Sequence, residues 1–393
     1  MIPFETAFEI VMDSARPLGA EAVPISNVLN RILAQDVASD TDIPPFNKSA
    51  MDGYACRRED LSNELTVIEE IPAGYVPRQV ITRNQCAKIM TGGIVPEGAD
   101  CVIMVEFTEN RAGNKIIFTG KETEDHICLK AEDVKKGEIV LRKGTKLMPH
   151  HIAVLATVGC VAPLVSRQPR IGIVATGNEL VEPGEQPSLS QIRNSNSYQL
   201  CAQVTAAGAI PTYYGIAKDT AGAIDATIKS SMVENDVIIL SGGVSMGEYD
   251  LVPDLLKENN FKLLFEKVGI KPGRPTVFGV SDEVFCFGLP GNPVSTFVIF
   301  ELIVKPFLYK MMGFDSTPAE IRMRLDQTIT REKVERTAWI PVAFTEGGGV
   351  APVEYHGSGH LNSLSEADGL ISIPVGISEV KEGTVVLVRP IQS

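Results

Sequence analysis

Residues 168–313 alternate short, uniformly apolar runs with segments of helical periodicity. Apolar runs of this kind are typical of strands that are buried on both faces, as in parallel sheets. The intervening segments repeat apolar residues at the three- and four-residue spacing of helices. The predicted strands cover residues 171–175, 210–214, 236–240, 277–280 and 284–289, and predicted helices end at Gly208 or span residues 224–232, 251–258 and 294–312. This alternation predicts a doubly wound parallel α/β module with helices on both faces.

The flanking regions follow other patterns, and 393 residues are too many for one ordinary core. We therefore predict an α/β multidomain protein. Its predicted modules are a discontinuous helical and extended N-terminal module (1–39 plus 131–167), an inserted mostly-β module (40–130), the α/β module (168–313) and a C-terminal β-barrel (314–393). In the first module, we expect a helix over residues 3–16 to pack against one over 151–157, and a strand pair between Gly137 and Gly144.

Composition excludes several classes of function. The formal net charge of −13 argues against a nucleic-acid partner, because phosphate binding requires a basic surface. The longest apolar runs are too short to cross a bilayer, and the N-terminus lacks the pattern of a secretory signal, so a cytoplasmic protein without a membrane partner is predicted. The seven cysteines show no CxxC spacing and are typical of reduced thiols. The motifs of P-loop ATPases and Rossmann dehydrogenases are absent from the sequence.

The candidate site lies at the carboxyl ends of the predicted strands, where open parallel sheets bind their ligands. Each of these ends leads into a glycine-rich or charged loop, and the loops cover residues 175–179, 217–219, 241–250, 271–275 and 288–295. Such turns direct backbone N–H groups toward an anion, and a following helix adds a favourable dipole. A single loop of this kind usually means only a tight connection. Several at one edge predict an anion-binding site.

Charged residues on these loops refine the prediction. Lys271 and Arg274 flank Pro272-Gly273, so they lie on a stiff loop that suits an oxyanion, although surface cations are the simpler interpretation. Glu179, Asp219 and Asp250 could each cap a helix. At one anion-binding edge they would repel the ligand unless a divalent cation lay between them. Mg²⁺, which uses carboxylates and substrate phosphates, is the predicted cofactor, with Asp219 and Asp250 as its ligands.

Six motifs in chain order resemble those of the molybdenum insertase family, which includes molybdopterin molybdenumtransferases and the C-terminal half of gephyrin. The motifs are Pro44-Pro45-Phe46 with residues 49–55, residues 89–93 with 95–100, and residues 176–180, 241–250, 271–275 and 289–295. The resemblance spans essentially the whole chain. It implies a reaction in which adenylylated molybdopterin takes up molybdate, releases AMP and becomes molybdenum cofactor.

The resemblance also implies an elongated homodimer, with the active cleft between the α/β module of one subunit and the inserted β module of the other. Transient contacts with molybdopterin adenylyltransferase and molybdopterin synthase are further expected partners. Together, the loops and the resemblance assign catalytic roles to Asp52, Thr91, Glu179, Asp219 and Asp250. They assign substrate binding to Gly242, Gly243, Ser245, Lys271, Arg274, Pro275, Asn292 and Ser295, and a weaker match adds Arg336 and Ser363.

The chain departs from the family pattern in three places. Asn47-Lys48 stands where bacterial relatives usually have Asp-Asn, and Arg274 replaces a common Lys while keeping its charge. Asn178 stands where Asp is usual, which leaves Glu179 as the carboxylate of that turn.

Two alternative functions are a molybdopterin adenylyltransferase and a non-enzymatic, gephyrin-like scaffold. The first would consist of a single domain with a threonine in the glycine loop, so the extra modules and Ser245 argue against it. The acids and cations of the predicted site favour catalysis over a scaffold.

Overall fold

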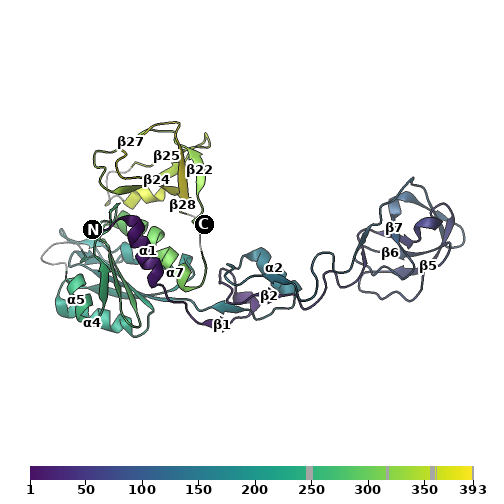
Figure 1. The fold of residues 1–393 in the computed structure, drawn as a ribbon, viewed down its shortest axis with the longest axis horizontal. Coiled ribbons are helices and arrows are strands. Elements are labelled where there is room, and N and C mark those ends of the chain that lie inside the picture. Colours follow the sequence, from purple (N-terminus) through teal and green to yellow (C-terminus); the bar gives the residue numbers. More distant parts are fainter. Residues whose placement is uncertain (245–250, 316–317, 355–358, 360, 392–393) are drawn as a thin grey trace.

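The computed structural model describes residues 1–244, 251–315, 318–354, 359 and 361–391. The molecule is elongated (Figure 1). An α/β body with the C-terminal strands beside it occupies one end, and a separate β module occupies the other. A narrow segment containing β1, β2 and α2 joins them. Within the described residues, no helix is long and apolar enough to cross a membrane.

The central sheet has six strands in the order β16-β13-β17-β21-β20-β18. Their bounds are β16 (Ile210–Ala217), β13 (Arg170–Thr176), β17 (Val237–Ser241), β21 (Phe285–Leu289), β20 (Val277–Val280) and β18 (Lys262–Phe265). The first four strands are parallel. The prediction of a wholly parallel sheet is wrong at the other edge, where β20 is antiparallel to both neighbours. Residues 281–284 are enough for a hairpin, whereas a parallel return needs a crossover of about a dozen residues.

Helices cover both faces of this sheet. They are α3 (Asn196–Ala206), α4 (Ala221–Met232), α5 (Val252–Glu258), α6 (Pro293–Ile299) and α7 (Lys305–Met311), with a π-helical turn, η4 (Phe300–Val304), between the last two. Alternate side chains of β17 lie on opposite faces of the sheet and belong to different apolar cores. Ile239 packs with α3, α6 and α7, whereas Ile238 and Leu240 pack with α4 and α5. Uniformly apolar strands are therefore required here, because each side chain meets a helix on one face or the other.

The N-terminal helix α1 (Phe4–Ser14) belongs to the core of the α/β body. Its apolar stripe of Phe4, Ala7 and Val11 is buried there, and α1 contacts α7. The expected packing of this helix against α2 (Pro149–Thr157) is therefore wrong. Helix α2 instead contributes Leu155 to a smaller core. A larger apolar core offers the stripe of α1 more buried surface.

Short strand pairs connect the two ends of the molecule. The pairs are β1 (Ala20–Ala22) with β12 (Leu164–Ser166), and β2 (Val37–Ala38) with β11 (Ile139–Leu141); η1 (Ile25–Asn27) lies near α2. The predicted strand pair within residues 137–144 is wrong, because the partner of β11 is β2, about a hundred residues earlier in the chain. Local turn signals predicted the strand but could not predict a distant partner.

The far module is built on the six-stranded sheet β7-β4-β6-β5-β9-β8. Its strands are β7 (Cys101–Met104), β4 (Gly53–Cys56), β6 (Gln85–Ile89), β5 (Glu64–Ile71), β9 (Lys115–Phe118) and β8 (Thr108–Arg111). The pair β3 (Lys48–Ser49) and β10 (Ile127–Cys128) and the short helices η2 (Arg58–Asp60) and η3 (Val105–Phe107) complete it. Separate apolar clusters lie on the two faces of the sheet. The module thus has its own core, away from the α/β body (Figure 1).

The described residues of the C-terminal region form strands and one short helix, η5 (Leu361–Ser365). The sheet runs β19-β24-β26-β28-β22, with β25 paired to β24, and β23 pairs with β27. The bounds are β19 (Ile270–Lys271), β22 (Ile321–Arg324), β23 (Ile329–Thr330), β24 (Thr337–Phe344), β25 (Val350–Pro352), β26 (Gly369–Ile373), β27 (Glu379–Val380) and β28 (Val385–Pro390). The closed barrel and the residue boundaries of the modules stay predictions. Strand β19 ties this sheet to the α/β body.

Candidate functional site

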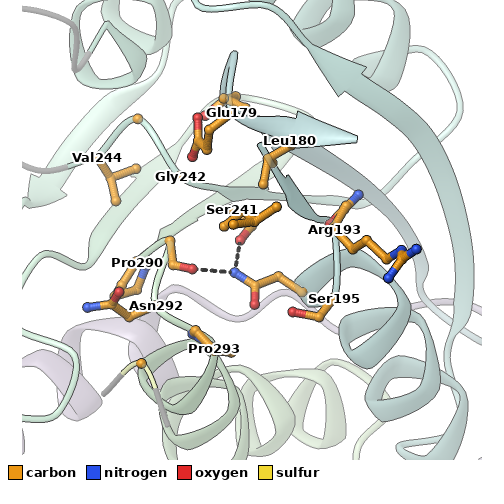
Figure 2. Close-up of a pocket in the computed structure, with 18 of the residues that line it drawn as sticks. Glu179, Leu180, Arg193, Ser195, Ser241, Gly242, Val244, Pro290, Asn292 and Pro293 are labelled. Carbon is orange, nitrogen blue, oxygen red and sulfur yellow. Dashed lines mark hydrogen bonds between the residues drawn. The ribbon is translucent and has the colours of Figure 1, made fainter. Parts of the chain in front are cut away.

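A cavity of about 600 Å³ opens at the carboxyl ends of the parallel strands (Figure 2). This is the sheet edge at which the glycine-rich loops were expected to meet. The cavity is lined by the ends of β13 and β17, the loops after β16 and β21, and the segment that precedes α3. Its predicted site residues are Glu179, Asp219, Gly242, Gly243, Pro275 and Asn292. The structure thus brings residues more than a hundred positions apart around one space.

The glycine turn after β17 forms one wall. Both Gly242 and Gly243 have positive φ angles, of 99° and 64°. A Cβ atom on Gly242 would lie 2.5 Å from the carbonyl oxygen of Thr176, and one on Gly243 would lie 2.9 Å from the Thr176 hydroxyl oxygen. Contacts this short exclude a side chain at either position. Glycine is required here because the turn packs its backbone directly against the end of β13.

Two carboxylates, those of Glu179 and Asp219, also line the cavity. The backbone N–H of Asn178 donates to Asp219 Oδ2 at 2.9 Å, and the backbone N–H of Asp219 donates to Asn178 Oδ1 at 3.3 Å. The carboxylate of Glu179 folds back over Gly177, where a Cβ atom would lie 2.6 Å from Glu179 Oε2. Both acids therefore have defined positions at the cavity.

The donor set suits a magnesium ion. The described residues contain no cluster of three or more His, Cys, Asp or Glu side chains that could hold a metal. Asp250, the third predicted acid, lies outside the described residues, as does Ser245. Mg²⁺ usually takes one or two carboxylates and completes its shell with water and substrate phosphate oxygens. Asp219 provides one such carboxylate on the cavity wall, at a site open to substrate.

Asn196, at the start of α3, connects three walls of the cavity. Its Nδ2 donates to Ser241 Oγ at the end of β17 and to the carbonyl oxygen of Gly291 after β21, each at 2.8 Å (dashed lines in Figure 2). The side chain is 9% exposed. One buried amide therefore holds α3, β17 and the β21–α6 loop at fixed separations.

Residues 180–195 form a strap along the cavity that contains a short parallel pair, β14 (Leu180–Val181) and β15 (Ile192–Arg193). Glu182 anchors this strap. It accepts hydrogen bonds from the hydroxyl groups of Tyr213, at 2.7 Å, and Tyr198, at 3.0 Å. Burial, followed by the bond to Glu182, raises the pKa of Tyr213, so its hydroxyl remains a proton donor at neutral pH. The Tyr213 hydroxyl in turn accepts a hydrogen bond from Asn194 Nδ2 at 2.7 Å. This bond connects the Glu182–Tyr213 pair to Asn194 on the cavity wall.

Arg193 is the one lysine or arginine among the described residues that line the cavity. Its Nε donates to the carbonyl oxygen of Glu185 at 3.2 Å, so the strap backbone holds the guanidinium group. The cavity lining therefore includes a cation that the strand-end loops did not predict. The charge would strengthen hydrogen bonds to phosphate oxygens.

The predicted cations Lys271 and Arg274 lie beside the cavity rather than on its wall. Both side chains are exposed, and only Pro275 of their loop lines the cavity. Lys271 belongs to β19, which pairs with β24 of the C-terminal sheet. Arg336 Nη1 donates to the carbonyl oxygen of Ile270 at 3.2 Å, so this arginine lies next to the Lys271 loop.

Two predicted serines lie close to the same region. Ser295 is buried in α6, the helix that begins at the cavity wall with Pro293. Ser363 is buried in η5, which contacts α6, and Leu361 of the same short helix lines the cavity. The C-terminal region therefore borders the site.

Asp52 and Thr91 lie together in the far β module. The backbone N–H and the hydroxyl of Thr91 both donate to Asp52 Oδ1, at 2.6 and 2.7 Å. These two bonds lower the pKa of the Asp52 carboxyl. Within one chain the module lies at the opposite end of the molecule from the cavity (Figure 1). The fold therefore pairs these two residues but does not bring them to the other site residues.

Comparison with known proteins places the chain in a family. Three family models match it in order: the MoeA N-terminal region (domain I and II) over residues 2–159, a probable molybdopterin binding domain over 172–310, and the MoeA C-terminal region (domain IV) over 324–391. The molybdopterin molybdenumtransferase of Bacillus subtilis is 34% identical over 402 residues, which cover 98% of this chain and 93% of that protein. The chain belongs to the molybdopterin molybdenumtransferase family.

Other members of the family agree. The molybdopterin molybdenumtransferase of Staphylococcus epidermidis is 34% identical over 93% of this chain and 89% of that protein. The crystal structure of a molybdopterin biosynthesis MoeA protein from Pyrococcus horikoshii OT3 matches with a TM-score of 0.86 and 33% identity, covering 99% of this chain and all of that one. These matches over nearly the whole chain confirm the family resemblance that the six motifs indicated.

Sequence reasoning missed Asn196, Asn194 and Arg193 in this family member. The sequence signal for these residues was a polar run, Arg193-Asn194-Ser195-Asn196, at the start of a helix with a buried apolar stripe. Asparagine and serine before a helix usually indicate only a cap. Here the side chain of Ser195 makes no capping bond, and Asn196 is turned into the protein interior instead.

Proposed function

We propose that this protein inserts molybdate into adenylylated molybdopterin, which releases AMP and forms molybdenum cofactor. The observation that carries the proposal is the cavity at the carboxyl ends of the parallel strands. It combines a glycine turn, two carboxylates and an arginine in a chain whose relatives along nearly their whole length are named molybdopterin molybdenumtransferase. A phosphate-bearing ligand suits backbone N–H groups and a cation, and carboxylates suit a divalent ion that accompanies it.

We assign the adenylylated pterin to the cavity and molybdate to the loop beside it. Gly242, Gly243 and Asn292 belong to turns whose backbone reaches the cavity wall. Lys271 and Arg274 would hold molybdate with charge-assisted hydrogen bonds, which suit a tetrahedral dianion. Their loop enters the cavity wall at Pro275, so a molybdate ion there would lie next to the pterin.

A magnesium ion would be held by Asp219 and Asp250. When bound, it would neutralise charge on the phosphates and so favour departure of AMP. The chain's own contribution is the orientation of the carboxylate. The backbone N–H of Asn178 bonds Asp219 Oδ2. Because the carboxylate is planar, this bond also fixes the position of its second oxygen, Oδ1. The side chain of Glu179, which lies over Gly177, would be a further catalytic carboxylate at the reacting phosphate.

The Asp52–Thr91 pair would act in the active site of a second copy of the chain. The pair is polar, preorganised and too far from the cavity of its own chain to serve it (Figure 1). A homodimer in which each far module covers the partner's cavity would use both sets of residues. A cytoplasmic location and transient contacts with molybdopterin adenylyltransferase and molybdopterin synthase stay predictions.

The test is molybdate-dependent release of AMP from adenylylated molybdopterin by the purified protein with Mg²⁺. We expect AMP to appear only when molybdate is present. ATP-dependent adenylylation of molybdopterin would instead favour the adenylyltransferase. No turnover of either substrate, with intact folding, would favour a scaffold. Asp225→Ala is a matched control for the acidic residues, because Asp225 is paired with Lys229 on α4 and does not line the cavity.

A further inference from the structure

Two polar atoms on the cavity wall have no hydrogen-bond partner within the described part of the chain. They are Thr176 Oγ1 and Asn196 Oδ1, and the described residues contain only two other buried side-chain atoms of this kind. Thr176 is 3% exposed and Asn196 is 9% exposed. Buried polar groups in proteins are nearly always bonded, because an unmet one destabilises the fold. Two unmet groups on one cavity indicate that a ligand supplies the partners.

The chemistry of the Asn196 group is determined by its other bonds. The carbonyl oxygen of Gly291 can only accept, so the NH₂ side of the amide must face it. The other nitrogen hydrogen is directed to Ser241 Oγ. Oδ1 is therefore an acceptor, and its missing partner is an N–H or O–H donor. A fully ionised oxyanion such as molybdate has no such donor and cannot be that partner.

The residues packed against Thr176 offer its hydroxyl no hydrogen-bond partner among the described residues. A Cβ atom on Gly242 or on Gly243 would each lie 2.9 Å from Thr176 Oγ1. With glycine at both positions, the turn packs closely and presents no side chain that could bond the hydroxyl. Asn196 bonds Ser241, the residue that precedes the same turn. The two side chains with unmet atoms therefore both lie next to this turn.

We propose that Thr176 is a substrate-contacting residue, and that it and Asn196 bond a nitrogen heterocycle that carries N–H donors. The proposal rests on the function proposed above. Adenylylated molybdopterin contains two such heterocycles, the pterin and the adenine. Both offer N–H donors for Asn196 Oδ1 and ring acceptors for the Thr176 hydroxyl. Thr176 and Asn196 thus select the organic part of the substrate, separately from the cations that bind molybdate.

Thr176→Val tests the hydroxyl with little change of shape. If no protein group bonds this hydroxyl, the melting temperature of the ligand-free variant should equal or exceed that of wild type. Thr276→Val is the matched control, because the buried Thr276 hydroxyl donates to the carbonyl oxygen of Gly273 at 2.7 Å. That variant should melt at a lower temperature. Asn196→Ala is less informative, since it also removes two bonds that hold the walls together.

Binding then tests the contact with substrate. We expect Thr176→Val to weaken binding of molybdopterin or of AMP, measured separately by calorimetry, by about five- to tenfold, and Thr176→Ser to restore it. Loss for one ligand alone identifies the pterin or the adenine as the heterocycle. The molybdate concentration for half-maximal AMP release should not change. Unaltered affinity for both ligands, or destabilisation as large as that of Thr276→Val, would overturn the proposal. Wild-type protein that binds neither ligand and releases no AMP would instead contradict the proposed function.

Discussion

Asn178 and Asp219 bond each other reciprocally, each backbone N–H donating to the other residue's side chain. The two residues follow neighbouring parallel strands, β13 and β16, so the bonds join two strand ends at the cavity. The family resemblance implies an Asp at the position of Asn178. An amide oxygen accepts the Asp219 N–H as a carboxylate would, but it places no second negative charge beside Asp219. The substitution therefore keeps the geometry and lowers the negative charge of this wall.

Replacing Asp219 should remove activity without unfolding the protein. We expect Asp219→Ala to lower the rate of AMP release by about 10- to 100-fold, because substrate phosphates lose the carboxylate that holds their counter-ion. The same loss is predicted for Asp250→Ala. AMP release at saturating substrate and Mg²⁺ measures the effect, and a thermal melt checks the fold. Full activity in both variants, with Asp225→Ala as the reference, would end this assignment.

Lys271 and Arg274 should control the response to molybdate. Lys271→Ala and Arg274→Ala are each expected to raise the molybdate concentration for half-maximal AMP release by roughly tenfold, since each loses a charge-assisted hydrogen bond. Binding of adenylylated molybdopterin should be nearly unaffected. If molybdate dependence is unchanged and Arg193→Ala alters it instead, the anion lies inside the cavity rather than on the Lys271 loop.

The shared site predicts complementation between inactive subunits. Asp52→Ala and Asp219→Ala proteins should each have strongly reduced activity. In a closed dimer with two equivalent sites, statistical mixing makes half of the molecules heterodimers, each with one intact site. About a quarter of wild-type activity should therefore return. Differently tagged subunits, co-purified to verify mixed dimers, provide the assay. Mixed dimers without activity would show that Asp52 does not serve the partner's cavity.

The pair Asp52–Thr91 predicts a pH effect of known sign. Its two hydrogen bonds hold the pKa of Asp52 below its ordinary value in the folded protein. The stabilisation from the ionised carboxylate is therefore complete above the unfolded pKa of about 3.9, and is lost as pH falls through the lower folded pKa. Thr91→Val removes one donor, so the pKa should move up toward the ordinary value. NMR titration of the Asp52 carboxyl carbon tests this, and an unshifted titration would contradict it.

Tyr213→Phe should loosen the strap over the cavity. The variant loses the bond to Glu182 and leaves Asn194 with one acceptor fewer, so amide hydrogen exchange in residues 180–195 should accelerate and affinity for the adenylylated pterin should fall a few-fold. Tyr214→Phe is the matched control from the same strand, since the Tyr214 hydroxyl bonds Asn235, away from the cavity. Equal effects of both substitutions on affinity would show that the strap anchor has no specific role.

Local sequence patterns predicted individual elements well where one periodicity dominates. Residues 277–280 were predicted as a strand with the bounds that β20 has. The glycine turn after β17 was predicted to border the site, and it does. Each of these signals lies within a few residues, as strand alternation and positive-φ turns do.

The amino-acid sequence by itself determined most strands and helices of the α/β module, the family and the sheet edge that carries the cavity, because each follows from local periodicity or from ordered motifs. Only the tertiary structure decided which long-range partners meet. In the structure, β20 is antiparallel to β21, and α1 packs against α7. Lys271 lies outside the cavity, whereas Arg193 belongs to its lining. It also showed that, among the described residues, Thr176 Oγ1 and Asn196 Oδ1 have no hydrogen-bond partner. A hydrogen bond depends on positions within a fraction of an ångström, and these are set by packing between segments far apart in the chain.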